Sequence, residues 1–370
     1  MRSSISLGVC HLHYRHQLPA LPIADINSAV TLRRAHLVLS YILHFYVQTL
    51  PPDSPVYIPR PLSIPLLQVS VQLDLPPVLT FSDTVLYNWA LNVPSEAAIP
   101  ALDNLRSQTL FSQLVDEEEF YLCSARIELR GVEALELMRV TMDETFVGDA
   151  IAVRRITNYL QRMAGVIKDL KTLLLDVRKN CDPETYYTKV RPWFRGEDSD
   201  IQKRKWVFEG LEEHPELQTP TELSGPSAGQ SSLVHVLDIF LGVDNRSSSS
   251  PDKPSFLTRM QSYMPRHHRL FLNHLSCSPR PLREFVLSAN HPHLLEAYNA
   301  AVLALKEFRD AHMIIATLYI VGPARRAAKA VQEDAKSGLP ECKPLIGTGG
   351  TALVKFLKDV RDRTTEALLS

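Results

Sequence analysis

Residues 294–321 read LLEAYNAAVLALKEFRDAHMIIATLYIV, and this stretch decides the expected fold. Its apolar side chains recur at steps of three and four residues, the spacing that lines one face of a helix. The residues on this apolar stripe are Tyr298, Ala301, Val302, Leu305, Phe308, Ile315, Ala316 and Tyr319. The pattern therefore predicts one long buried helix, which Gly322 and Pro323 should end.

Helical periodicity recurs in most of the remaining chain. It predicts helices over residues 35–47, 82–91, 117–138, 149–179, 233–241 and 352–369. Strand-like alternation is confined to residues 69–73, recurrent prolines predict an extended connector over residues 50–77, and the serines within residues 242–250 predict a surface loop. We expect an all-α fold, with a small N-terminal domain over residues 1–110 and a large helical domain over residues 111–370.

The bulk composition excludes several classes of protein. The 370 residues are 45% hydrophobic and 22% charged, which is ordinary for a globular protein. The formal net charge of −1 gives no field that would recruit nucleic acid or an anionic membrane. The pattern predicts neither a signal peptide nor a membrane span. Five cysteines without a C-x-x-C spacing support neither a disulfide framework nor a structural zinc site, so we expect a cytoplasmic protein with reduced thiols.

His312 lies on the apolar stripe of the long helix and is the first candidate for chemistry. A buried imidazole without a partner costs about 1–3 kcal/mol, and Phe308 and Ala316, one turn away, offer no hydrogen-bonding side chain. Spacing alone favours a core histidine that bonds to another helix. The alternative is an axial ligand to haem iron, which requires a neutral imidazole on an apolar wall. Arg309 would then pair with a haem propionate or a nearby acid.

Five motifs, in this order, resemble those of the indoleamine 2,3-dioxygenases. They are LTFSDTVLYNW (79–89), GPSAGQSS (225–232), YMPRHHR (263–269), RDAHMIIATLYI (309–320) and GTGGT (347–351). Each motif alone is weak, because loops of glycine, serine and threonine are common. Five in order around a helix-face histidine are specific, and the resemblance covers roughly nine-tenths of the chain.

The resemblance implies a cofactor, haem b, whose iron is ferrous when active. It makes His312 the proximal iron ligand and leaves the opposite face open for dioxygen. It also matches Asp238 to the family aspartate beside Arg309, and this pair would hold the ligand's helix next to the cofactor. An ordinary buried ion pair is the plainer reading of the same two residues.

The resemblance also implies three catalytic residues. Arg191 matches the arginine that grips the substrate carboxylate, a task suited to a planar bidentate donor. Ser124 is the small hydroxyl near the oxygen site, where it would tune hydrogen bonding, since an unactivated hydroxyl is a poor base. Thr348 lies in the glycine-rich loop that would close over the substrate. The plainer interpretation of Arg191 is a stacked surface arginine. The plainer interpretation of the glycine-rich loop is a flexible connector.

The substrate pocket implied by the resemblance is mostly aromatic and apolar, as an indole ring requires. Core packing is the plainer reading of each aromatic residue taken singly. The matching residues are Phe81, Thr84, Val85, Phe120, Tyr121, Tyr186, Phe194, Ser227, Ala228 and Gly229.

The reaction implied is insertion of both atoms of dioxygen into the indole ring of L-tryptophan, giving N-formylkynurenine, the first step of the kynurenine pathway towards NAD. The implied partners are tryptophan or a related indoleamine, dioxygen and an electron donor, and the protein should be a monomer. Tyr186 and Arg195 depart from the family pattern, and the family's first helices have no recognisable counterpart before residue 33. The alternatives are a catalytically weak haem-binding paralogue that acts as a sensor or regulator, and a helical interaction module without haem.

Overall fold

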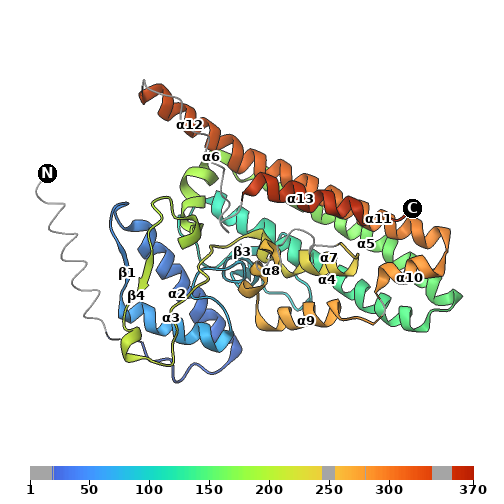
Figure 1. The fold of residues 1–370 in the computed structure, drawn as a ribbon, viewed down its shortest axis with the longest axis horizontal. Coiled ribbons are helices and arrows are strands. Elements are labelled where there is room, and N and C mark those ends of the chain that lie inside the picture. Colours follow the sequence, from blue (N-terminus) through green and yellow to red (C-terminus); the bar gives the residue numbers. More distant parts are fainter. Residues whose placement is uncertain (1–18, 20, 244–254, 280, 336–351) are drawn as a thin grey trace, which may run out of the picture.

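Long helices surround the main hydrophobic core and make up the larger part of the molecule (Figure 1). The computed structural model describes residues 19, 21–243, 255–279, 281–335 and 352–370. Helix α5 packs against both α4 and α11, and α13 packs along α11. The bounds of these helices are α4 Val115–Val147, α5 Ala150–Asp176, α11 Pro292–Ala316 and α13 Leu353–Glu366.

A two-residue turn joins α4 to α5 and sets them side by side. Gly148 ends α4 with a φ of 67°, a conformation that a glycine adopts without strain. Asp149 then caps α5, because its side chain accepts a hydrogen bond from Ala152 N at 2.7 Å. The apolar faces of the two helices therefore meet in the main core.

The long helix over residues 294–321 is confirmed, but its expected end is wrong. After α11 the chain makes a π-helical turn, Thr317–Val321, and continues directly as α12, Gly322–Ala335. Gly322 N donates to Thr317 O across the wider turn. Pro323 lies in the first turn of α12, directly after the π-helical turn. A proline that looks like a stop signal is therefore accommodated at a junction between two helices.

The N-terminal part builds a second hydrophobic core around α2 (Ala29–Thr49) and α3 (Arg60–Leu73). The strand-like run at residues 69–73 is wrong, and so is the extended connector over residues 60–73, because α3 occupies both. Pro59 is the N-cap of α3 and a further proline lies in its first turn, positions that proline favours. Pro65 lies inside the helix, so α3 loses one backbone hydrogen bond there. The Pro65 side chain is buried, and this burial offsets part of the loss.

Two short β-ladders complete this region. Strand β1 (Val56–Ile58) pairs in parallel with β4 (Trp206–Phe208), so residues from the middle of the chain join the second core. Strand β2 (Trp89–Leu91) pairs antiparallel with β3 (Leu105–Ser107). The helix expected over residues 82–91 is wrong, since only Ser82–Leu86 form a π-helical turn there.

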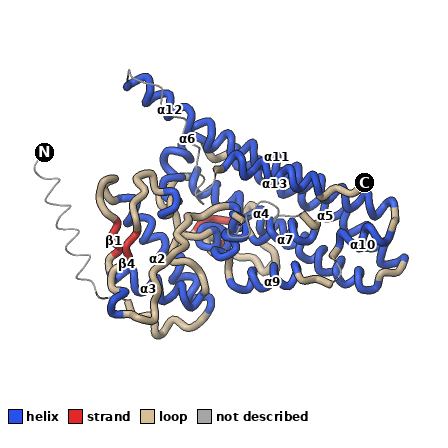
Figure 2. The backbone as a smooth tube through the Cα atoms, viewed as in Figure 1, coloured by secondary structure: helices blue, strands red, loops and turns tan. Residues whose placement is uncertain are grey.

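The remaining predicted helices are confirmed, and the all-α class with them (Figure 2). The helices between residues 255 and 289 were not predicted from the sequence. No helix in the described part of the chain is long and apolar enough to span a membrane. The other bounds are α6 Pro183–Thr185, α7 Ser232–Phe240, α8 Phe256–Met260, α9 Arg266–Ser276 and α10 Leu282–Ala289.

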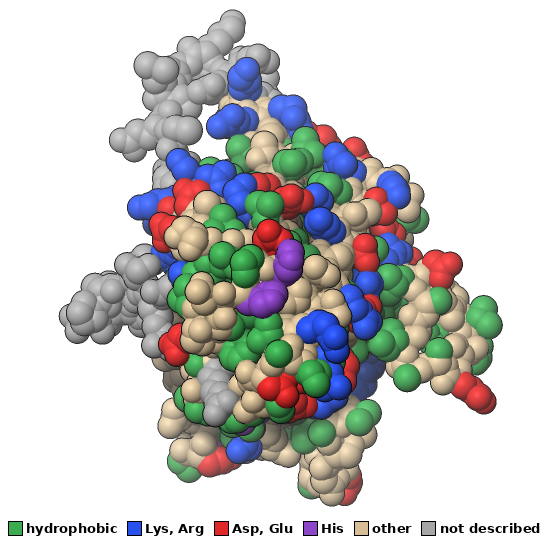
Figure 3. Space-filling view, turned by 90° about the vertical axis from the view of Figure 1, so that its right-hand side faces the viewer, with side chains coloured by type: hydrophobic (Ala, Val, Ile, Leu, Met, Phe, Trp, Pro, Cys, Tyr) green, Lys and Arg blue, Asp and Glu red, His purple; other side chains and the backbone are tan. Residues whose placement is uncertain are grey.

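The surface agrees with the near-neutral charge of the chain. On the face shown in Figure 3, acidic and basic side chains alternate, and no large field of one sign appears. Exposed ion pairs lie on the surface of the described part of the chain, such as Arg139 with Glu136 and Asp143. Pairs of this kind contribute little to stability, because water screens them.

Candidate functional site

A cavity of about 150 Å³ lies among the helices of the main core. It brings together residues from α4, α11, α13, the turn before β2 and the loop before α7, so no single segment builds it. Twelve of the residues expected from the sequence line it: Phe81, Thr84, Val85, Phe120, Tyr121, Ser124, Tyr186, Phe194, Ser227, Ala228, Gly229 and His312.

Aromatic rings form one wall of this cavity. The ring centroids of Phe120 and Tyr186 lie 4.4 Å apart, those of Phe120 and Phe194 5.9 Å, and those of Tyr186 and Tyr319 5.7 Å. These separations are within the range at which aromatic pairs attract. The wall is therefore built of apolar rings that pack against one another.

The hydroxyl groups of the wall differ in their hydrogen bonds. Tyr121 donates to Glu117 Oε1 at 3.1 Å, and Tyr319 donates to the backbone oxygen of Cys181 at 2.6 Å. In the described part of the chain, the hydroxyls of Tyr186 and Ser124 bond to no other protein group. Burial raises the pKa of Tyr186, so its hydroxyl keeps its proton at neutral pH. Two uncommitted hydroxyls therefore remain for a bound molecule.

A second cavity of about 120 Å³ adjoins the first along seven shared residues. His312 and Ser124 are among the shared residues, while Asp238, Arg309 and Glu128 line only the second cavity. Glu128 accepts a hydrogen bond from Ser231 Oγ at 2.6 Å, and burial raises its pKa to about 7. Both cavities therefore reach the His312 side chain.

The His312 imidazole differs from the other histidines of the interior. His36, His44, His235 and His268 each hydrogen bond through a ring nitrogen to a side chain or a carbonyl. His312 makes no hydrogen bond to any described residue. Burial, together with the nearby Arg309 charge, lowers its pKa to about 4. The ring is therefore neutral at physiological pH and has a nitrogen lone pair to share.

Asp238 and Arg309 form a buried ion pair behind His312. Asp238 on α7 is 1% exposed and Arg309 on α11 is 6% exposed. The Arg309 guanidinium donates to Asp238 and also to the Thr364 hydroxyl on α13. The pair therefore ties α7, α11 and α13 together at the turn that precedes His312, and the expected pairing is present.

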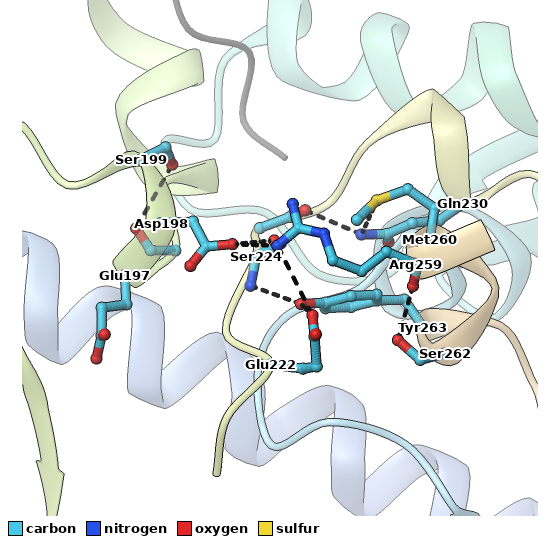
Figure 4. A network of polar contacts seen from close by, with 12 residues as sticks. Glu197, Asp198, Ser199, Glu222, Ser224, Gln230, Arg259, Met260, Ser262 and Tyr263 are labelled. Carbon is cyan, nitrogen blue, oxygen red and sulfur yellow. Dashed lines mark hydrogen bonds and ion pairs between the residues drawn. The ribbon is translucent and has the colours of Figure 1, made fainter. Parts of the chain in front are cut away.

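A buried polar network holds the loop before α7 against the cavity. The Gln230 side chain accepts a hydrogen bond from Phe81 N at 2.8 Å and donates to Gly225 O at 3.0 Å. Figure 4 shows this residue beside a second set of contacts, in which Arg259 Nη1 lies 2.9 Å from Asp198 Oδ2. Ser224, in the same loop, donates from its hydroxyl to Asp198 and from its backbone N–H to a tyrosine hydroxyl (Figure 4). The position of the cavity loop is thus fixed from both sides.

Two of the expected catalytic residues do not line the cavities in the described part of the chain. Arg191 is 7% exposed, and its guanidinium carbon lies 5.6 Å from the centroid of the Tyr187 ring, outside the lining of both cavities. Thr348 and its glycine-rich loop lie outside the described residues. The roles expected of Arg191 and Thr348 stay predictions.

Comparison with known proteins places the chain in a family. A family model described as indoleamine 2,3-dioxygenase matches residues 13–367. The indoleamine 2,3-dioxygenase 2 of Homo sapiens is 32% identical over 355 residues, which are 95% of this chain and 83% of the human protein. The chain belongs to the indoleamine 2,3-dioxygenase family.

Two fungal relatives support the same placement. The indoleamine 2,3-dioxygenase of Saccharomyces cerevisiae is 32% identical, covering 95% of this chain and 82% of the yeast protein. The 6-hydroxytryptophan 2,3-dioxygenase of Fusarium equiseti is 31% identical, covering 100% of this chain and 90% of the fungal protein. The resemblance drawn from the five motifs is therefore confirmed over nearly the whole chain.

The indoleamine 2,3-dioxygenase family is haem-dependent, and the residues of this chain fit a haem. A neutral imidazole without a protein partner is the donor that haem iron takes. The surrounding walls are apolar, as a porphyrin requires, and the Arg309 guanidinium at the edge of the second cavity is the kind of donor that pairs with a propionate.

Several residues that line the cavities were not predicted from the sequence. Phe256, Phe356 and Leu357 line the first cavity, and Glu128 lines the second. Glu128 follows Ser124 by four residues on one helix, a spacing that would have placed both on the same face. The residues from α8 and α13 carried no such signal, because their approach to the cavity depends on tertiary packing.

Proposed function

We propose that this chain is a haem-dependent dioxygenase that inserts both atoms of dioxygen across the pyrrole double bond of L-tryptophan's indole, giving N-formylkynurenine. The observation that carries the proposal is the neutral His312 imidazole, which has no hydrogen bond to a described residue and faces apolar cavities. The family supports the substrate class and dioxygen as co-substrate. We also propose that the protein is a cytoplasmic monomer that takes electrons from an external donor.

His312 would bind the iron, and the Asp238–Arg309 pair would hold the helix that carries it. Arg309 would also hold a propionate. When bound, ferrous haem supplies the electron exchange that lets dioxygen react with a closed-shell indole. The neutral state of His312 matters here, because a protonated imidazole has no lone pair to donate.

The aromatic wall would hold the indole ring and exclude water from the reacting atoms. Phe120 and Phe194 offer faces at stacking distance of each other, and an indole inserted beside them would make offset or edge contacts. Ser124 Oγ, uncommitted within the described residues, would donate a hydrogen bond near the oxygen site without taking a proton. The protein would then contribute by orienting the substrate and by excluding water, and not through a side-chain base.

Arg191 would bind the substrate carboxylate after leaving the Tyr187 ring. Its contact with Tyr187 is a cation–π interaction worth about 0.5–2 kcal/mol, and a bidentate carboxylate pair is a stronger competitor. Thr348 would offer a hydroxyl to the substrate, as the family resemblance implies. Replacement of Arg191 by glutamine should raise KM more than it lowers kcat, and Thr348→Ala should lower the rate with haem binding unchanged.

The test of the function uses the purified protein loaded with haem and reduced with dithionite. Addition of tryptophan should shift the Soret band, and admission of air should yield N-formylkynurenine, detected at its ultraviolet absorption. The His312→Ala variant should lose haem binding, while the matched change of the exposed His293, 77% exposed at its side chain, should retain it. Fully loaded, reduced protein that forms no product would reject the activity, and unaltered haem binding by His312→Ala would reject the ligand.

A catalytically weak paralogue that senses haem or an indoleamine is the second candidate. The observation in its favour is the position of Arg191 outside the cavity lining. Such a protein would bind haem and shift its Soret band without turnover. Single-turnover measurements distinguish the two, since a sensor would return its tryptophan unchanged.

A further inference from the structure

A separate cavity of about 240 Å³ lies on the other side of the 3-10 turn Arg191–Phe194. Phe194 lines the first, aromatic cavity, whereas Pro192 and Trp193 line this separate cavity. The other walls come from the end of α2 and from residues 200–204. One short turn therefore separates the proposed active site from a pocket to which the family resemblance and the proposed function assign no role.

The floor of this pocket is held by α2. His44 Nδ1 donates to Trp193 O at 2.8 Å, while its Nε2 accepts from Leu79 N at 3.2 Å, which defines the neutral tautomer. Gln48, one turn further along α2, donates to Arg195 O at 2.9 Å. The Trp193 ring stacks on Phe45 and on a second phenylalanine, with centroids 5.5 and 5.2 Å away. The backbone and the aromatic wall are thus in place before any ligand arrives.

The charges of the pocket do not balance. Asp200 is fully engaged: its Oδ2 accepts two bonds from the Arg204 guanidinium at 3.0 and 2.8 Å, and its Oδ1 accepts two backbone N–H groups. The Arg195 guanidinium, partly buried, has no hydrogen bond or ion pair with any described residue. Two guanidinium groups against one carboxylate leave one uncompensated positive charge, that of Arg195.

We propose that this pocket, the Arg195 pocket, binds a small aromatic carboxylate. The ligand's carboxylate would bind the Arg195 guanidinium through two parallel hydrogen bonds. No described protein group occupies this position on Arg195. The ligand's ring would pack against Trp193 and Pro192 on the apolar side. Burial and the neighbouring Arg191 charge both lower the pKa of Arg195, so an anion here relieves an unfavourable environment.

A ligand in the Arg195 pocket would also weaken substrate binding at the proposed active site. Arg191 and Arg195 are the two cations at the ends of one turn, and an anion on Arg195 reduces the positive potential that the substrate carboxylate meets at Arg191. This coupling rests on the proposed function, whereas binding of the carboxylate does not. The expected effect is a rise in the KM for tryptophan of about two- to fivefold, the scale of one unit charge acting through partly solvated surroundings.

Isothermal titration of the haem-loaded protein with benzoate tests the site. Benzoate should bind with a Kd of about 1 mM or tighter, and acetate and inorganic phosphate should bind more weakly, since they lack the ring. Arg195→Gln should weaken binding at least about tenfold, and Arg195→Lys should restore part of it, as expected when a point charge replaces a planar fork. Lys205→Gln is the matched control, because Lys205 is a nearby exposed cation, 84% exposed at its side chain, that does not line the pocket.

Each outcome decides one part of the proposal. Unchanged benzoate binding by Arg195→Gln would place the anion elsewhere and overturn the site. Equal binding of phosphate and benzoate would overturn the aromatic class. Benzoate binding that survives saturating tryptophan and is lost in Arg195→Gln supports the site even in a protein without turnover, so its success or failure is independent of the dioxygenase activity.

Discussion

Removal of Asp238 should destabilise the protein through the charge it leaves behind. The Asp238–Arg309 pair is almost fully buried, with side chains 2% and 7% exposed. Breaking such a pair from one side costs about 3–5 kcal/mol, because an uncompensated charge remains in a low-dielectric interior. That cost is a large fraction of a typical unfolding free energy of about 5–15 kcal/mol. We therefore expect Asp238→Leu to lower the unfolding free energy by about 3–5 kcal/mol.

A double-mutant cycle separates the lost charge from the lost packing. Arg309→Met alone removes the guanidinium but leaves the Asp238 carboxylate buried, so it should cost a similar amount. The double variant leaves neither charge, and its loss should be smaller than the sum of the two by about 2 kcal/mol or more. The Thr364 hydroxyl keeps its bond to Val360 O in every variant, so it adds no new unsatisfied group.

Urea unfolding of the haem-free protein, followed by circular dichroism, gives these free energies without a contribution from ligand binding. The control is the exposed Arg139–Asp143 pair, with side chains 62% and 70% exposed. Asp143→Leu should change the unfolding free energy by less than about 1 kcal/mol. An Asp238→Leu variant that costs no more than this control, or a double variant that loses the full sum, would contradict the buried-charge origin of the effect.

Three further changes test other parts of the structure. Gly225→Ala should lower the unfolding free energy in urea by more than about 2 kcal/mol, because the added Cβ would lie 1.8 Å from the Phe194 backbone oxygen. Gly165→Ala should instead stabilise α5, since no atom lies within 4 Å of its Cβ. Equal effects of the two changes would contradict the packing at Gly225. The pKa of His44 is lowered from 6.5 to about 4 by burial, so its neutral form stabilises the fold above pH 6.5 and this contribution is lost as the pH falls towards 4. A pH–stability curve of the wild type should therefore fall more steeply over that range than that of His44→Gln, and parallel curves would refute the assignment. Tyr186→Phe should leave stability within about 1 kcal/mol, since the hydroxyl bonds to no described group, but should alter the relative KM for ring-hydroxylated and plain tryptophan; unchanged ratios would show that this hydroxyl faces no substrate.

Local patterns predicted the helices well because helix formation depends on neighbours along the chain. The three- and four-residue spacing over residues 294–321 was sufficient to place His312 on the inner face. The errors arose where tertiary contacts override local preference. Residues 59–65 contain three prolines at positions that α3 tolerates, and Asp83 bonds to His36 and to Thr80, which replaces the predicted helix by a π-helical turn.

The candidate site shows the same division. Motif resemblance identified the residues from Phe81 to His312 that line the first cavity, since those residue types recur in order along the chain. It did not reveal the lining residues from α8 and α13, because no sequence period predicts which face of a short helix meets a cavity formed by others. Arg195, one of the two departures from the family pattern, lines a separate pocket behind the turn.

The amino-acid sequence by itself determined the helical class, the family and the inward position of His312, because periodicity and motif order are properties of consecutive residues. Only the tertiary structure decided which polar groups are left without a partner. The His312 ring is unbonded among the described residues while the other interior histidines are bonded, and Arg195 keeps an uncompensated charge. The reason is physical: hydrogen bonds and charge balance in the interior depend on residues that are distant in sequence and adjacent only after folding.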